Sequence, residues 1–412
     1  MTPERAKAYL DKISERGMNP GLERMKTLMS LTGHPEKKFK SIHLTGTNGK
    51  GSTSAMLESV LRSSGIRTGL YTSPHILDLT ERIGIAGRPI SWRSLAAWIG
   101  KIREIAGRME KDLTYFETVT AAAFCAFAQE RVELAVVEVG LGGRFDATNV
   151  LPAPIIAVIT NISLEHTQYL GKSLRSIAWE KAHIVKKGSV CVTGASGAAF
   201  PPIRAACRRA GARIYAVKRS SSKTWEKFRP ALRGDFQRAN LALALKTLEV
   251  LRKKGWDIPR KAVSDGLKDV RWPGRFQTEK FKGRTVLMDG AHNPGAMKAL
   301  TAALRGASFS KRPCLLAFNA LNDKNIAEMA GDLMKNLAVK RVLIPRLASS
   351  RSSDPEETRR IFLRARPDLA TDTYASVKDL WTGLGKMNIP RTDWILASGS
   401  FHMVGETLRA LR

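Results

Sequence analysis

The chain has 412 residues, of which 43% are hydrophobic and 25% are charged, and these values are ordinary for a soluble globular protein of two or three domains. Lysine and arginine outnumber aspartate and glutamate 68 to 37, which gives a formal net charge of +31. Such an excess favours anionic partners. The basic residues are scattered, however, and no recognition-helix or RNA-binding motif occurs, so we do not expect nucleic acid as the ligand.

The cysteines and the amino-terminal sequence give expectations about location. Cys125, Cys191, Cys207 and Cys314 are far apart and form no Cys-x-x-Cys pair, which is typical of reduced core thiols. The first residues lack an apolar signal core, and no run of about 18 apolar residues occurs. We therefore expect a soluble cytoplasmic protein without a membrane partner.

Strand and helix patterns alternate along most of the chain. Two predicted helices, over 3–16 and 22–31, come first and are separated by a turn at 19–21. Further strands are predicted at 41–44, 134–139, 155–159 and 190–192, and helices at 91–109, 117–131 and 174–185. Continuous apolar strands that alternate with helices favour a parallel sheet covered on both faces. A short β element is expected after the serines at 220–222.

A Pro-Gly punctuation at 271–275 follows two more predicted helices, 237–254 and 259–270. Beyond it the alternation restarts, with strands at 285–288, 314–318, 341–344 and 394–397 and helices at 294–304 and 326–336. The sequence therefore predicts an α/β fold with two domains, a larger one over residues 1–275 and a smaller one over residues 276–412.

The most informative segment covers residues 44–53 and runs from the first strand of this alternation into a helix. Its glycines can let backbone N–H groups close around phosphate oxygens at the start of the helix. Only two residues separate Gly46 from Gly49, whereas the common phosphate loop has four. Lys50 would meet the outer phosphates, and the hydroxyl of Ser52 or Thr53 would lie near a metal ion. We interpret the segment as a variant nucleotide-binding loop, with a plain glycine-rich turn as the alternative.

Polar residues follow two other predicted strands. Glu138 ends an apolar strand, where an unpaired carboxylate would be costly, so either Mg²⁺ or a buried basic side chain should neutralise it. The glycine-rich loop at 140–149 could reach into a site or be an ordinary loop. His166 follows the next strand and is a candidate ligand. Two further residues would not be selected as site residues by their local patterns alone. Ser73 lies in a Ser-Pro turn, and Lys181 lies in a helical pattern, where an exposed lysine is the default.

The second predicted domain begins its alternation in a similar way. A strand ends in Asp289, and Gly290 and His292 follow it. Asn293 and Pro294 fit the N-cap and first position of a helix. Two strand ends of this kind on two domains predict an active site in the cleft between them.

Five ordered motifs resemble those of one family. They are Thr-Gly-Thr-Asn-Gly-Lys-Gly-Ser at 45–52, Thr-Ser-Pro-His at 72–75, the segment 138–149, Trp-Pro-Gly-Arg at 272–275 and the segment 289–294. Together they resemble the folylpolyglutamate synthase/dihydrofolate synthase branch of the Mur ligases. The resemblance implies a P-loop ATPase-like N-terminal domain and a Rossmann-like C-terminal domain.

The activity that the resemblance implies is ATP-dependent amide formation. A phosphoryl group passes from ATP to a substrate carboxylate, and the amino group of glutamate displaces phosphate from the acyl phosphate. Such chemistry needs positioning and charge neutralisation more than covalent work by the protein. The expected acceptor is dihydropteroate, a reduced folate or both, and two Mg²⁺ ions and a monomer are expected.

The resemblance also assigns roles to residues of this chain. ATP contacts fall on Gly49, Lys50, Gly51, Ser52, Asn240, Arg275 and Asp289. Mg²⁺ contacts fall on Ser52, Ser73, Glu138, His166 and Lys181, the last as a carbamate. The residues expected to take part in catalysis are Lys50, Lys181 and His292. Acceptor contacts fall on Asn19, Pro20, Gly21, Leu22, Thr114, Phe145, Asp146 and Ala147.

Two alternatives remain. One is a Mur-type ligase that joins an amino acid to a cell-wall precursor, although the loop at 142–149 and the lack of a uridine-nucleotide domain before residue 45 speak against it. The other is a basic, nucleotide-gated binder of nucleic acid, which would need a salt-dependent complex with a defined nucleic acid.

Overall fold

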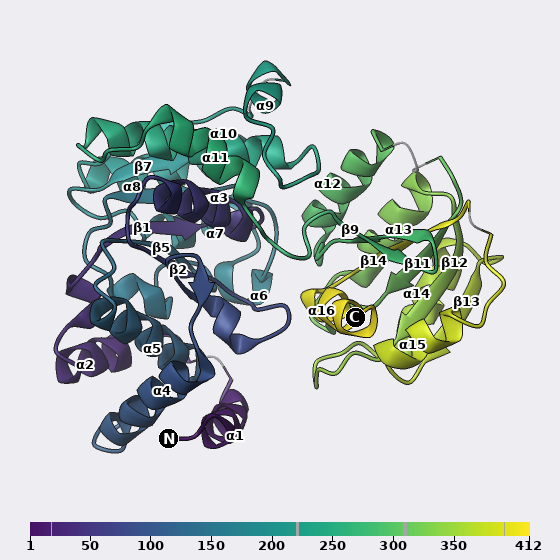
Figure 1. The fold of residues 1–412 in the computed structure, drawn as a ribbon, viewed down its shortest axis with the longest axis horizontal. Helices are drawn as coiled ribbons and strands as arrows, with labels where there is room; N and C mark the ends of the chain where they lie inside the picture. Colours follow the sequence, from purple (N-terminus) through teal and green to yellow (C-terminus); the bar gives the residue numbers. More distant parts are fainter. Residues whose placement is uncertain (18, 220–221, 308–310, 391) are drawn as a thin grey trace. The chain divides into compact units, whose positions relative to one another are not determined.

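The computed structural model describes residues 1–17, 19–219, 222–307, 311–390 and 392–412, and these residues form two units (Figure 1). Unit 1 consists of residues 1–75, 79–231 and 238–270, and unit 2 consists of 76–78, 232–237 and 271–412. The division of the chain into functional domains at 275/276 stays a prediction. None of the helices that the described residues form is both long and apolar enough to cross a membrane.

Unit 1 is built on an eight-stranded sheet with the order β4-β3-β2-β5-β1-β6-β7-β8. All neighbouring strands are parallel except the pairs β2–β3 and β3–β4, which are antiparallel. The strands are β1 (Lys40–Thr45), β2 (Thr68–Tyr71), β3 (Ile83–Ile85), β4 (Arg88–Pro89), β5 (Leu134–Glu138), β6 (Ile156–Ile159), β7 (Val190–Thr193) and β8 (Arg213–Ala216).

Helices cover both faces of this sheet, as the continuous apolar strands predict. The helices are α1 (Pro3–Ser14), α2 (Glu23–Leu31), α3 (Lys50–Ser63), α4 (Trp92–Ala106), α5 (Tyr115–Gln129), α6 (Thr167–Leu170), α7 (Leu174–Ala182), α8 (Phe200–Arg209), α9 (Ser222–Phe228), α10 (Gln237–Lys253) and α11 (Arg260–Asp269). Short 3₁₀ turns are η1 (Pro35–Lys37), η2 (Leu79–Arg82), η3 (Ala147–Val150) and η4 (Gly197–Ala199). Helices α1, α2, α4 and α5 share one apolar core with β2 and β5, and α7 and α8 pack on β6 and β7.

Helix α3 packs tightly against α11. A Cβ on Gly266 of α11 would lie 2.5 Å from the Cα of Val60, so the helices can approach this closely only because that residue is glycine. Ser59 donates a hydrogen bond to the carbonyl of Gly266 at 2.7 Å, which ties the two helices together. This contact fixes the helix whose first turn carries the phosphate loop.

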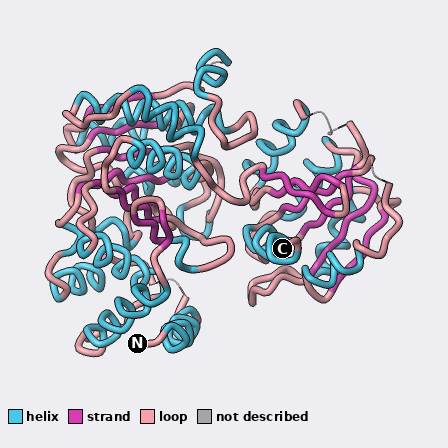
Figure 2. Tube along the Cα trace, in the orientation of Figure 1, coloured by secondary structure: helices cyan, strands magenta, loops and turns pink. Residues whose placement is uncertain are grey.

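Unit 2 is a doubly wound α/β unit, and Figure 2 shows its strands with helices beside them. Its strand order is β13-β12-β11-β14-β10-β9, in which the pair β10–β9 is antiparallel and the other neighbouring pairs are parallel. Its strands are β9 (Gln277–Phe281), β10 (Arg284–Met288), β11 (Cys314–Phe318), β12 (Val339–Pro345), β13 (Ala370–Tyr374) and β14 (Trp394–Ser398). Its helices are α12 (Pro294–Arg305), α13 (Ile326–Asn336), α14 (Pro355–Ala365), α15 (Val377–Leu384) and α16 (Phe401–Ala410). Helices α12–α14 pack on one face of the sheet, and α15 and α16 pack on the other.

The predicted α/β class and the two mostly parallel sheets are confirmed. One local prediction is wrong: the segment after the serines is the helix α9, and not a β element. Trp225 and Phe228 are half-buried and three residues apart, a spacing that places both on one side of a helix. Positions 220 and 221 lie outside the described residues.

Candidate functional site

Strand order brings the predicted site residues of unit 1 to one edge of its sheet. Strands β2, β5, β1 and β6 are consecutive neighbours, and parallel strands present their carboxyl ends on the same side. Ser73 follows β2, Glu138 ends β5, the phosphate loop follows β1, and His166 lies beyond β6. Segments far apart in the chain therefore meet along one row of strand ends.

Two glycines make the phosphate loop possible. Gly46 has a φ of +146°, and a Cβ there would lie 1.8 Å from Oγ1 of Thr160. Gly49 has a φ of +85°, and its Cβ would lie 2.2 Å from Oδ1 of Asn240. Any side chain at either position would both strain the backbone and collide with a neighbour. The second approach also places Asn240, predicted as a nucleotide contact, directly beside the loop.

The segment after β6 supports the loop, a role that the sequence analysis did not assign to it. Thr47 donates its N–H to the carbonyl of Asn161 at 2.8 Å, and Asn48 donates its N–H to Oδ1 of Asn161 at 2.9 Å. Thr160 Oγ1 donates to the carbonyl of Asn48 at 2.7 Å. The position of Thr160 and Asn161 in the chain could have indicated this role, because both directly follow a strand that neighbours β1.

Two lysines meet at the base of the loop. Lys50 donates from Nζ to the carbonyls of Gly46 at 3.1 Å and Thr47 at 3.2 Å, and Lys181 donates to the same Gly46 carbonyl at 2.9 Å. Lys181 is 5% exposed, so the default expectation of an exposed lysine in this helix is wrong. Burial, followed by repulsion from Lys50, lowers the pKa of Lys181 to about 7, while Glu165 acts in the opposite direction.

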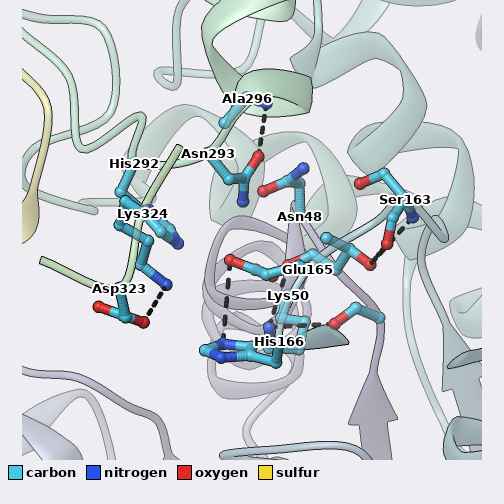
Figure 3. A network of polar contacts seen from close by, with 12 residues as sticks. Asn48, Lys50, Ser163, Glu165, His166, His292, Asn293, Ala296, Asp323 and Lys324 are labelled. Carbon is cyan, nitrogen blue, oxygen red and sulfur yellow. Dashed lines mark hydrogen bonds and ion pairs between the residues drawn. The ribbon is translucent and has the colours of Figure 1, made fainter. Parts of the chain in front are cut away.

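The candidate metal ligands are rich in oxygen. Glu138 and Ser52 are 3% and 2% exposed, and Glu138 lies in register with Leu44 beside the loop. Glu165 Oε1 lies 3.9 Å from Nε2 of His166. Figure 3 draws this contact. Among the described residues no three His, Cys, Asp or Glu side chains gather into a metal site. The predicted set instead combines a carboxylate with serine hydroxyls, hard donors that suit Mg²⁺.

The residues predicted to contact the acceptor lie on three segments of unit 1. Thr114 caps α5 through a capping box with Glu117, and Glu117 is ion-paired to Arg24 in the helix that follows Asn19–Leu22. Ala147 belongs to the same apolar core as α2 and α5. The structure therefore brings the three segments into one region. Arg24 and Glu117 were not selected from the sequence, because a Thr-x-x-Glu pattern is explained by helix capping alone.

Asp146 is held in place on the third segment. Its Oδ1 accepts from the N–H of Thr148 at 3.0 Å and its Oδ2 from the N–H of Leu141 at 2.9 Å, while burial raises the pKa of Asp146. Oγ1 of Thr148 also contacts Nε2 of His43 at 2.8 Å, and burial lowers the pKa of His43 to about 3. Phe145, in contrast, is 46% exposed and can meet a ligand.

The predicted site residues of unit 2 also form a cluster. Asp289 accepts from the N–H groups of Phe276 and Ala291, both at 2.9 Å, and burial raises the pKa of Asp289 although Arg275 opposes this. The guanidinium of Arg275 lies 4.4 Å from the ring centre of Phe401. The ring centres of His292 and Phe401 are 5.2 Å apart.

The helix that follows this cluster begins as predicted. The side chain of Asn293 accepts from the N–H of Ala296 at 2.8 Å and caps α12, with Pro294 at its first position, which confirms that prediction (Figure 3). The N-cap fixes the direction in which the chain leaves β10. This cap and the hydrogen bond from the N–H of Ala291 to Asp289 hold the two ends of the turn that contains His292.

Two family models match the chain. The Mur ligase middle domain matches residues 44–244, and the Mur ligase glutamate ligase domain matches residues 274–401. The dihydrofolate synthase/folylpolyglutamate synthase of Bacillus subtilis is 35% identical over 350 residues, which are 79% of this chain and 81% of that protein. Two archaeal relatives are longer, and the chain spans 49% of the Haloferax volcanii protein and 43% of the Halobacterium salinarum protein.

Solved structures agree with these matches. Escherichia coli FolC in complex with DHPP and ADP superposes with a TM-score of 0.86 at 28% identity, covering 99% of this chain and 97% of that one. A bifunctional folylpolyglutamate synthase/dihydrofolate synthase with Mn, AMPPNP and L-glutamate bound has a TM-score of 0.84 at 29% identity, with 98% of each chain covered.

Proposed function

Because this chain belongs to the folylpolyglutamate synthase/dihydrofolate synthase family of Mur ligases, we propose that it joins L-glutamate to a pteroate or folyl acceptor at the expense of ATP. It is an ATP-dependent glutamate ligase that uses a divalent metal ion. One observation on the chain itself carries this conclusion. A phosphate loop with two glycines that no other residue could replace without a clash lies beside the buried carboxylate of Glu138. We propose further that it acts as a cytoplasmic monomer on small-molecule substrates.

The phosphate loop binds the nucleotide in this proposal. Backbone N–H groups in the first turn of α3 have no intrahelical acceptors and favour phosphate oxygens. Lys50 exchanges its contacts with the Gly46 and Thr47 carbonyls for the outer phosphates, with Gly49, Gly51 and Ser52 around them. When bound, ATP supplies the phosphoryl group that converts the acceptor carboxylate into an acyl phosphate. The amino group of glutamate then displaces phosphate from this acyl phosphate.

The metal ions would be held by residues at the strand ends. Ser52, Ser73, Glu138 and His166 supply oxygen and nitrogen donors there, and Lys181 would add a carboxylate after its neutral amine takes up CO₂ and loses a proton. The lowered pKa of Lys181 supports this role, because only the neutral amine is a nucleophile. When bound, Mg²⁺ neutralises the charge that develops on the transferred phosphoryl group.

Unit 2 contributes charge and orientation in this proposal. Arg275 carries a cation that can pair with phosphate oxygens, and Asp289 holds the turn that presents His292 through its two backbone hydrogen bonds. Arg275 and Asp289, like Asn240 in α10, would contact the nucleotide. Asn19, Pro20, Gly21, Leu22, Thr114, Phe145, Asp146 and Ala147 would contact the pteroate or folyl acceptor.

Glutamate-dependent ADP release tests this function. Purified protein with Mg²⁺ and ATP is given 7,8-dihydropteroate or tetrahydrofolate, with and without glutamate. We expect ADP release that requires both glutamate and one of the acceptors, and its near-complete loss in the variant Lys50→Met. Turnover with dihydropteroate, with tetrahydrofolate or with both identifies the acceptor. No glutamate-dependent ADP release with either acceptor would refute the proposal.

A further inference from the structure

A buried ion pair joins the start of α2 to the start of α5. Nε of Arg24 lies 3.0 Å from Oε1 and 3.1 Å from Oε2 of Glu117, and Nη2 of Arg24 lies 2.9 Å from Oε1. The two side chains are only 8% and 5% exposed. A planar guanidinium that faces a carboxylate in this way is fixed in orientation as well as in place.

Each partner of this pair also holds one of the segments predicted to contact the acceptor. Nη2 of Arg24 donates to the carbonyl of Asn19, which begins the segment Asn19–Leu22. Oε2 of Glu117 accepts from the N–H of Thr114 at 2.8 Å, and Thr114 Oγ1 accepts in return from the N–H of Glu117 at 3.3 Å. One buried charge pair therefore connects two segments that are about 90 residues apart in the chain.

Apolar packing also joins the two helices that this pair connects. Met25 and Leu28 of α2 already pack in the same apolar core as Val119 of α5. An apolar pair of similar volume often stabilises a protein as well as a buried ion pair does, so the charges are better explained by the geometry they impose. Asn19–Leu22 forms neither helix nor strand, and the guanidinium fixes the place of its first carbonyl.

We propose that Arg24 and Glu117 are positioning residues for the pteroate or folyl acceptor. They hold Asn19–Leu22 and Thr114 at a fixed separation before the acceptor binds, so that binding does not have to order the first segment. The inference rests on the proposed function, because it assigns these segments to the acceptor. It adds two residues, neither of which touches the substrate.

Two variants separate positioning from stability. The double variant Arg24→Met/Glu117→Gln leaves no unpaired charge, and its glutamine can still accept from the N–H of Thr114, but the link to Asn19 is lost. Arg24→Lys keeps the charge but lacks the planar fork that reaches Glu117 and Asn19 together. Arg62→Lys is the matched control, because Arg62 pairs with the buried Glu58 at 3.2 Å in the same unit, away from both segments.

The measurements are KM for each of the three substrates, kcat, the Kd of the acceptor without ATP, and the urea midpoint. Losing a hydrogen bond from a charged group should raise acceptor KM and Kd about tenfold or more in both variants. KM for ATP and glutamate should stay within about twofold, as should every constant of Arg62→Lys. Unchanged acceptor constants, or equal changes for all substrates that follow the urea midpoint, would overturn the inference. A wild-type protein that neither binds nor converts any pteroate or folate would instead refute the proposed function.

Discussion

Replacing Lys181 by methionine should make the metal-free protein more stable while it abolishes ligase activity. The side chain is 5% exposed, and burial together with Lys50 lowers its pKa from 10.5 to about 7. Below that pH the folded protein holds a proton that its surroundings disfavour. Methionine has nearly the same length and carries no charge, so the substitution removes this cost with little change in packing.

The size of the effect follows from the two pKa values. Holding the proton in the folded state near pH 6 costs about 4–5 kcal/mol. Loss of the 2.9 Å bond to Gly46 subtracts about 1–2 kcal/mol at most, because Lys50 still donates to that carbonyl. The expected net gain is about 2–4 kcal/mol near pH 6.

The gain should depend on pH in a defined direction. Between about pH 7 and 10.5 the unfolded wild type keeps the proton of Lys181 whereas the folded wild type has lost it, so wild-type stability rises with pH in this window. Lys181→Met lacks this rise. Its advantage over the wild type should therefore shrink by about 2–3 kcal/mol between about pH 6 and 9.

Urea unfolding in CO₂-free buffer with EDTA measures both quantities. The exposed Lys187, changed to methionine, is the control for removal of one positive charge from the same part of the chain. If Lys181→Met is no more stable than the wild type at the lower pH, or if its advantage is the same at both pH values, burial does not disfavour the Lys181 proton.

Three further predictions concern activity. Lys181→Ala should lose most of its activity and regain part of it with added short carboxylates such as acetate; a fully active Lys181→Ala would exclude a carbamate ligand. Glu138→Gln should lower kcat about 100-fold or more and raise the Mg²⁺ requirement, measured by titration of Mg²⁺ at saturating ATP, and normal turnover would remove Glu138 from the metal site. Gly49→Ala should weaken ATP binding much more than Gly65→Ala does, because both glycines have a φ near +85° but only the Cβ at Gly49 would meet Asn240; equal effects in nucleotide titrations would mean that the close approach is unimportant.

The phosphate loop could be predicted because its signal is local. A strand, a glycine-rich turn and a helix start fall within about a dozen residues, and the turn requires residues that tolerate positive φ. The position of Glu138 at the end of a strand was equally predictable, because the four residues before Glu138 are all apolar. The N-cap of α12 could also be predicted, because Asn293 followed by Pro294 is a local pattern.

Features that depend on distant contacts could not be predicted from the residues alone. Lys181 is buried because Gly46, 135 residues earlier, offers it a carbonyl, and nothing in the pattern of α7 indicates this. The pairing of Arg24 with Glu117 is hidden for a similar reason, because local capping already explains the glutamate. The roles assigned to the site residues came from the resemblance to the family, and they stay predictions for this chain.

The most direct test of the account follows oxygen through the reaction. Acceptor labelled with ¹⁸O in its reacting carboxylate is turned over with ATP, Mg²⁺ and glutamate, and the released phosphate is analysed by mass spectrometry. Transfer of the phosphoryl group to the carboxylate, followed by attack of the glutamate amino group, predicts one ¹⁸O in each phosphate and ADP as the nucleotide product. Unlabelled phosphate, or AMP and pyrophosphate in place of ADP, would contradict the account.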